Sequence, residues 1–199
     1  MIEKKFINLK KQEFEIKEYL KKNFDYVSSV KVERTPLGEK IIIKSCKPHL
    51  IFGSRGENID KIIEILKKQF GLDNPQIEVQ PIDNMFLDAA SVAEYIKKSL
   101  EKFGPLSFKV VAYRALDKIK EAGAIGAEIR LTGKLPSERA RSWLFSFGNL
   151  IKSGAYREQI VDYAKTEALT IPGYVGIKVR IIKPFSILPD KIEIKEKTE

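Results

Sequence analysis

The sequence is poor in the residues that build disulfides and metal sites. Its 199 residues include one cysteine, Cys46, and one histidine, His49. A single cysteine forms no internal disulfide, and one Cys with one His falls short of the about four ligands of a structural zinc site. We therefore expect a reducing compartment, no metal and no cofactor, and we interpret both residues as structural.

Long apolar runs are also missing. No apolar run approaches the roughly 20 residues that cross a bilayer, and the charged N-terminus has no apolar core of signal-peptide length. These absences predict a cytoplasmic protein with no membrane partner.

Catalytic motifs are equally scarce. The sequence contains no Gly-Lys-Ser/Thr phosphate loop, and with one cysteine and one histidine a catalytic Cys-His pair has little support. Carboxylates are numerous, but none stands out from ordinary helix-surface charge. We therefore predict that the chain is not an enzyme and has no catalytic residues.

Positive charge is the most informative feature that the chain does have. It carries 36 Lys and Arg against 27 Asp and Glu, a formal net charge of +9 and a pI of about 9.4. Such a balance favours an anionic partner, most often nucleic acid. The excess is unequal: up to Asp83 it is 16 − 13 = +3, and beyond it 20 − 14 = +6.

A short glycine-bracketed loop is the first motif that points to nucleic acid. Gly53, Ser54, Arg55 and Gly56 lie between an apolar lead-in and apolar residues that resume at helical spacing. Glycines allow close backbone approach, and amides at a helix N-terminus suit phosphate. The loop resembles the GXXG loop of the KH fold, which clamps about four nucleotides of single strand. The alternative is an ordinary packing turn between two helices.

The elements around this loop predict its fold. Periodicity and turn residues indicate, in order, a helix over 10–23, strands over 27–34 and 39–45, a short helix from Pro48, a helix from Glu57 to Gly71, and a strand over 76–80. A helix and strand placed before the minimal KH unit resemble the type II variant of that fold. We therefore predict a type II KH domain over residues 1–83.

The remainder predicts a second α+β domain over residues 84–190. Asp83 or Asn84 is expected to cap a first helix, and Ser107 a second that ends at Gly123. Apolar period then changes to two, which predicts four strands and hence two helices on one face of a four-stranded, mainly antiparallel sheet. Period-two spacing favours core packing over base stacking for Trp143. The charged residues 191–199 are expected to form a tail.

Basic residues gather in this second domain. Six of them lie from Arg130 to Arg157, with Glu138 as the only acid. Arg130, Lys178 and Arg180 share the non-apolar side of their strands. A solvated surface normally mixes both signs, so phosphate contact is the favoured interpretation and a solvated face the alternative.

Several motifs in this half resemble one family. The stretches 123–129 and 132–142, the latter including Gly-Lys-Leu-Pro-Ser-Glu-Arg-Ala, are similar to the C-terminal domain of the small ribosomal subunit protein three family, in its archaeal form. Gly154 and residues 173–179 fit the later strands of that domain. A type II KH domain is the N-terminal half of the family, so the resemblance covers nearly the whole chain.

The resemblance implies a structural constituent of the small ribosomal subunit. Members bind small-subunit rRNA in the head, lie beside the tenth and fourteenth proteins and line the messenger RNA entrance channel. Carried over, the KH loop is the single-strand site, and the rRNA-binding residues are Arg130, Lys134, Arg139, Arg141, Lys152, Arg157, Lys178 and Arg180. Members often have adjacent basic residues where this chain has Phe108-Lys109-Val110, so contact with mRNA falls to Lys109 and Arg114. The alternative function is a free KH-type RNA-binding regulator or chaperone outside the ribosome.

Overall fold

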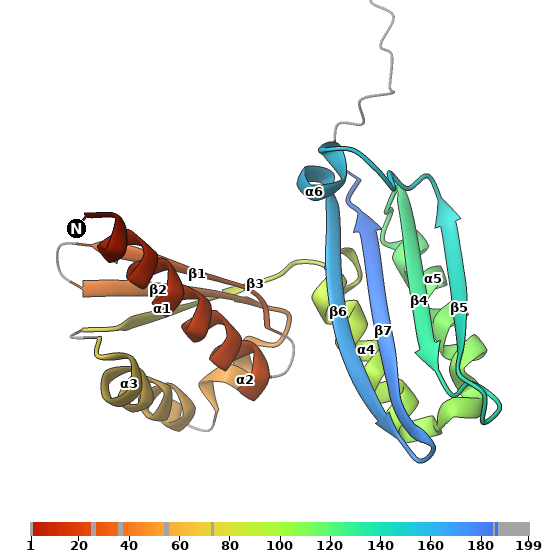
Figure 1. Ribbon diagram of the computed structural model, residues 1–199, viewed down its shortest axis with the longest axis horizontal. Helices are drawn as coiled ribbons and strands as arrows, with labels where there is room; N and C mark the ends of the chain where they lie inside the picture. The colour runs from red at the N-terminus through yellow and green to blue at the C-terminus, as the bar shows by residue number, and fades with distance from the viewer. Residues whose placement is uncertain are drawn as a thin grey trace, which may run out of the picture. The chain divides into compact units, whose positions relative to one another are not determined.

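The computed structural model describes residues 2–24, 27–35, 38–53, 56–72, 74–184 and 186. The chain divides into two compact units, Met1–Met85 and Phe86–Glu199, each with its own core. They are called the N-terminal and C-terminal units below (Figure 1). None of the described helices is both long and apolar enough to span a bilayer. The predicted tail over 191–199 lies outside the described residues, and the predicted boundary at 83 stays a prediction.

Among its described residues, the N-terminal unit contains three α-helices and a three-stranded sheet. In chain order they are α1 (Ile2–Asn23), β1 (Val27–Thr35), β2 (Gly38–Ser45), α2 (Pro48–Phe52), α3 (Glu57–Phe70) and β3 (Gln76–Pro81). β2 is the central strand, antiparallel to β1 and parallel to β3. This is the predicted order of elements, and it confirms the N-terminal part of the fold class.

One element is longer than the sequence predicted. α1 begins at Ile2 rather than near Lys10, and its residues 3–8 are exposed. Good helix formers continue there without a Gly or Pro, so local propensity extends the helix beyond the part that packs. On the same helix Phe14 is 65% exposed, whereas Ile16 and Leu20 are buried.

The core of the N-terminal unit draws on every helix. Its buried residues are Ile16, Leu20, Val27, Val30, Ile41, Ile43, Ile51, Ile62, Leu66 and Leu72. α2 and α3 on either side of the glycine loop both contribute, through Ile51 and through Ile62 with Leu66. Burial of these side chains therefore holds the two ends of the loop in place.

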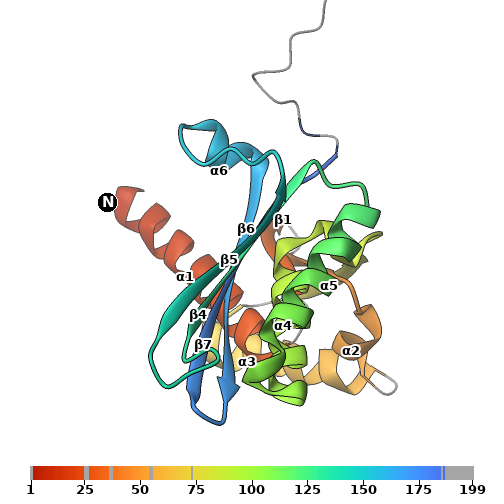
Figure 2. The same ribbon diagram turned by 90° about the vertical axis from the view of Figure 1, so that its right-hand side faces the viewer.

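The C-terminal unit is two helices on a four-stranded sheet. Its elements are η2 (Met85–Leu87), α4 (Ala89–Phe103), η3 (Pro105–Ser107), α5 (Phe108–Glu121), β4 (Gly126–Gly133), β5 (Arg141–Gly148), α6 (Tyr156–Ile160), β6 (Val161–Thr170) and β7 (Gly173–Ile182). The strand order is β5-β4-β7-β6, and all pairs are antiparallel. Figure 2 shows α4 and α5 together on one side of the sheet, which confirms the predicted architecture.

The cap of α4 differs from the prediction. Asp88 caps the helix, and its Oδ2 accepts hydrogen bonds from the Ser91 backbone N–H at 2.9 Å and hydroxyl at 2.6 Å. The prediction that Asp83 or Asn84 caps this helix was wrong, because the 3₁₀ turn η2 lies between them and the start of α4. Ser107 precedes α5, but its hydroxyl donates to the Gly104 carbonyl at 2.9 Å instead of capping the helix.

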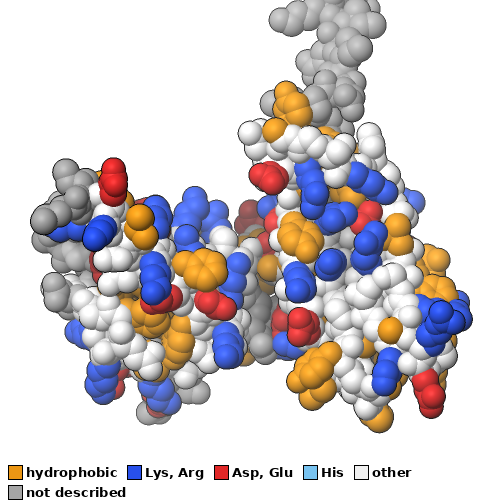
Figure 3. All heavy atoms as spheres, in the orientation of Figure 1, with side chains coloured by type: hydrophobic (Ala, Val, Ile, Leu, Met, Phe, Trp, Pro, Cys, Tyr) orange, Lys and Arg blue, Asp and Glu red, His pale blue; other side chains and the backbone are white. Residues whose placement is uncertain are grey.

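The two faces of the C-terminal sheet are chemically different. On the two central strands, β4 and β7, alternate residues point to α4 and α5 and are buried, among them Ala127, Ile129 and Leu131 on β4. The remaining residues point to the other side, which we call the open face. Figure 3 shows Lys and Arg side chains gathered over the open face.

Candidate nucleic-acid interface

The KH loop is defined in the structure by its two glycines. Gly53 ends α2 with φ of 69°, and Gly56 precedes α3 with φ of 86°, both in the left-handed region. A Cβ on Gly53 would lie 2.6 Å from the Asn58 Nδ2, and that amide donates to the Leu50 carbonyl at 3.4 Å. The positive φ makes any other residue strained at position 53, and a Cβ there would also displace the Asn58 side chain. Ser54 and Arg55 lie outside the described residues.

Two acidic residues follow the loop at the start of α3. Glu57 and Asp60 lie in the first turn of α3, where they interact favourably with the helix dipole. The same carboxylates disfavour a phosphate at that helix terminus. Leu50 and Phe52 of α2 are 45% and 41% exposed, which gives the loop an apolar flank.

An exposed ion pair joins two strands of the N-terminal unit. Lys40 Nζ on β2 lies 2.6 Å from Glu78 Oε2 on β3. The hydrogen bond and charge of Glu78 raise the pKa of Lys40 above its ordinary 10.5. Hydrogen bonds from Lys40 and from the neighbouring Gln80, together with the charge of Lys40, lower the pKa of Glu78 below its ordinary 4.5.

Three cations form one cross-strand row on the open face. Arg130 of β4 is directly opposite Lys178 of β7, and Lys178 is directly opposite Lys165 of β6. Arg130 and Lys165 are exposed and Lys178 is half-buried. The sequence predicted the side shared by Arg130 and Lys178 but missed Lys165. The only indication in the sequence was that Lys165 lies in a strand with alternating polar residues. Its neighbours can be identified only once the register between β6 and β7 is known.

The adjacent row contains a buried carboxylate. Glu128 of β4 is 3% exposed. Its Oε1 accepts a hydrogen bond from Arg180 Nη1 at 3.0 Å, and its Oε2 lies 3.6 Å from Lys152 Nζ. The Arg180 guanidinium is also 5.8 Å from the ring centroid of Tyr163. Two of the predicted rRNA-binding residues, Arg180 and Lys152, are thus partly neutralised within the chain.

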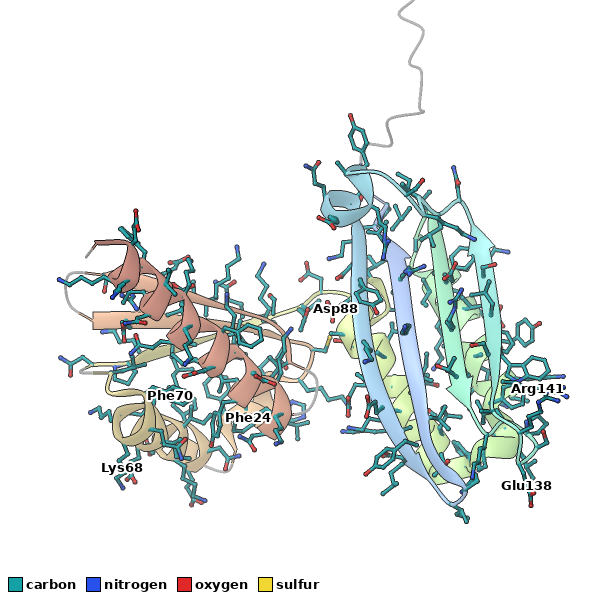
Figure 4. The ribbon with its side chains drawn as sticks, in the orientation of Figure 1. Phe24, Lys68, Phe70, Asp88, Glu138 and Arg141 are labelled. Carbon is teal, nitrogen blue, oxygen red and sulfur yellow. The ribbon has the colours of Figure 1, made fainter. Side chains whose placement is uncertain are left out.

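The other predicted rRNA-binding residues lie elsewhere. Lys134 and Arg139 are exposed in the segment between β4 and β5, and Arg141 begins β5 opposite Gly133. Figure 4 labels Glu138 and Arg141 at the outer edge of the sheet. Arg157 is exposed in α6, after β5. The eight predicted residues therefore lie on the open face (Arg130, Lys178 and Arg180), in the β4–β5 segment, at the start of β5, between β5 and α6 (Lys152) and in α6.

Lys109, one of the two predicted mRNA contacts, lies on an aromatic ring. Its Nζ is 5.1 Å from the ring centroid of Trp143 and 6.0 Å from that of Phe108. The Trp143 indole N–H donates to the Leu135 carbonyl at 2.9 Å, and its ring packs against the core. This confirms the prediction that Trp143 is a packing residue. Arg114, the other predicted contact, is exposed further along α5.

Comparisons with known families agree with both halves. The KH domain family matches residues 15–84, and the family described as ribosomal protein S3, C-terminal domain, matches residues 96–181. The matches thus correspond to the three-stranded unit with the glycine loop and to the four-stranded unit with the basic open face.

Similarity to individual proteins extends over nearly the whole chain. Small ribosomal subunit protein uS3 of Methanocaldococcus jannaschii is 39% identical over 100% of this chain and 96% of its own length. The uS3 proteins of Sulfurisphaera tokodaii and Sulfolobus acidocaldarius are 37% and 40% identical, over 98% and 92% of this chain and 87% and 79% of theirs. All three are archaeal, as the sequence indicated, and none is named as an enzyme. This chain belongs to the uS3 family of small ribosomal subunit proteins.

Proposed function

We propose that the chain is a structural constituent of the small ribosomal subunit in the cytoplasm and binds small-subunit rRNA in the head. The observation that carries this proposal is the near full-length similarity to proteins named for that subunit. The proposed neighbours are the tenth and fourteenth proteins of the subunit. The role is one of assembly and positioning, without chemistry at a catalytic site.

The distribution of charge supports rRNA contact through the C-terminal unit. Beyond Asp83 the sequence has 20 basic and 14 acidic residues, a net charge of 20 − 14 = +6. Exposed cations stand on the open face at Arg130 and in the β4–β5 segment at Lys134 and Arg139. Phosphate contacts of this kind release counterions, so they contribute affinity that falls as salt rises. The KH loop of the N-terminal unit is the proposed contact with single strands.

A second part of the proposal concerns messenger RNA. Lys109 and Arg114 are proposed to line the entrance channel, because both are exposed on α5. The cation–π contact of Lys109 with Trp143 limits the motion of a side chain that would otherwise have many rotamers. A cation held at a fixed place loses less entropy when it meets a phosphate.

Titration of rRNA binding against salt tests the proposal. If the purified full chain makes about five phosphate contacts with small-subunit rRNA, log K should fall with log salt at a slope of roughly −4. Replacing Lys134, Arg139 and Arg141 together by Ala should weaken binding, since each charged contact is worth on the order of 1 kcal/mol or more.

The matched control replaces the same number of exposed lysines outside the proposed sites, Lys67, Lys102 and Lys120, by Ala. It should bind nearly as tightly as the wild type. A slope near zero, or equal losses in the two triple variants, would contradict rRNA binding through these residues. Binding to short single strands without preference for small-subunit rRNA would favour the free KH-type regulator instead.

A further inference from the structure

We infer that Arg130, Lys178 and Lys165 form a cation row that binds the phosphodiester backbone of an RNA strand running across the open face. This inference rests on the proposed function and assigns the RNA contact to one surface. It adds Lys165, which the motifs and the family resemblance left out. It also separates these three residues from Arg180 and Lys152.

The row has a geometry suited to consecutive phosphates. Its members stand on three adjacent strands, β4, β7 and β6, at directly opposite positions. Because neighbouring strands lie about 4.8 Å apart, the outer two Cα positions are separated by roughly 10 Å. Like charges placed directly opposite one another destabilise a sheet. An anion that bridges the row would remove that repulsion.

Among the described residues, no carboxylate neutralises the cation row. Glu128, in the adjacent row, is already paired with Arg180 and Lys152. Glu167 points to the same side from β6, opposite Gly176, one row further along. Among the described residues, no ion pair joins a carboxylate to any member of the cation row. The described carboxylates therefore leave the charge of the cation row available to an external phosphate.

The surroundings of the row favour RNA over an acidic protein. Lysine is depleted in protein–protein interfaces, whereas it is a standard phosphate ligand. Tyr163, on β6 two residues before Lys165, is 49% exposed and has the Arg180 guanidinium against its ring. An exposed ring beside a line of cations is the arrangement with which proteins bind single-stranded nucleic acid, through stacking together with backbone contacts.

The test compares the wild type with the triple variant Arg130→Gln, Lys178→Gln, Lys165→Gln in filter binding to small-subunit rRNA over a range of salt. Loss of three phosphate contacts should make the slope of log K against log salt less steep by roughly 2 to 2.7. The control variant Lys67→Gln, Lys102→Gln, Lys120→Gln removes the same charge and should keep the wild-type slope. Lys165→Gln alone should change the slope by roughly 0.7 to 0.9, and Lys165→Arg should not change it.

A thermal melt of each variant separates binding from folding. Because the row contains only like charges, its neutralisation should leave the midpoint of unfolding equal to the wild type or higher. A wild-type slope in the triple variant would overturn the inference while leaving the proposed function intact, and it is the result expected if the row binds an acidic protein. The inference would also be overturned if the triple variant and the control variant both lost slope by the same amount. Failure of the wild type itself to bind the rRNA would overturn the proposed function.

Discussion

Replacement of Arg180 by Gln should destabilise the C-terminal unit more than any other single loss of charge on the open face. Arg180 donates to a carboxylate of Glu128 whose side chain is only 4% exposed. The variant therefore leaves a buried negative charge with Lys152 as its remaining partner, 3.6 Å away. Removal of one member of a buried ion pair costs about 3–5 kcal/mol.

The expected loss lies at or just below the lower limit of that range. The Arg180 side chain is 23% exposed, so water already weakens the pair, and Lys152 continues to compensate part of the charge. We therefore expect the free energy of unfolding to fall by about 2–3 kcal/mol. For a unit of this size, that corresponds to a midpoint lower by roughly 10 °C or more.

The chain provides its own probe for this measurement. Trp143 is its single tryptophan and belongs to the C-terminal unit, so fluorescence during thermal or urea unfolding follows that unit alone. The matched control is Arg130→Gln, which removes an exposed cation of the open face and should change stability by only about 0.5 kcal/mol.

A double variant tests the reasoning itself. Glu128→Gln with Arg180→Gln removes both charges, and it should recover much of the stability that Arg180→Gln loses, since the cost comes from an uncompensated charge. The reasoning is refuted if Arg180→Gln behaves like Arg130→Gln, or if the double variant is at least as unstable as Arg180→Gln.

Three other perturbations address the KH loop, the strand ion pair and the mRNA contact. Replacing Ser54 and Arg55 by Asp should weaken binding to single-stranded RNA in a filter assay without changing the far-UV circular dichroism, and unchanged affinity would make the loop purely structural. The lowered pKa of Glu78 contributes stability above its ordinary 4.5 that is lost as pH falls through the folded value. The raised pKa of Lys40 contributes stability below 10.5 that is lost as pH rises through the folded value. Urea unfolding of Glu78→Gln should therefore show a weaker dependence on pH at both extremes, and curves parallel to the wild type would contradict the assignment. Binding of single-stranded RNA at Lys109 should alter the emission of the single tryptophan 5.1 Å away, and a response that persists in Lys109→Ala would exclude that contact.

Local patterns in the sequence were sufficient for the main helices and strands and for the glycine loop, but not for the short helix α6. Positive φ at Gly53 and Gly56 is what a tight turn between two helices requires, and periodicity alone separated the helices from the strands. Helix ends were less predictable. Asp83, Asn84 and Asp88 are all good N-caps, and only the 3₁₀ turn over 85–87 decides in favour of Asp88.

The site could be predicted only where alternation along a single strand assigns a residue to one side of the sheet. Arg130, Lys178 and Arg180 followed from alternation along β4 and β7. Lys165 could not be placed, because its neighbours depend on how β6 is aligned with β7. The pairing of Glu128 with Lys152 and Arg180 was equally inaccessible, since it joins residues that are 24 and 52 positions apart. No local pattern shows that two of the residues predicted to contact phosphate, Lys152 and Arg180, are paired with Glu128.

The central claim is that this chain is a structural constituent of the small ribosomal subunit. The most direct measurement is sedimentation of a cell extract containing the tagged full-length chain through a sucrose gradient, at low salt and again after a high-salt wash. The account predicts that the chain sediments with the small subunit, stays there at low salt and is released as salt rises, because phosphate contacts hold it. A chain that remains at the top of the gradient at low salt, apart from the subunit, would contradict it.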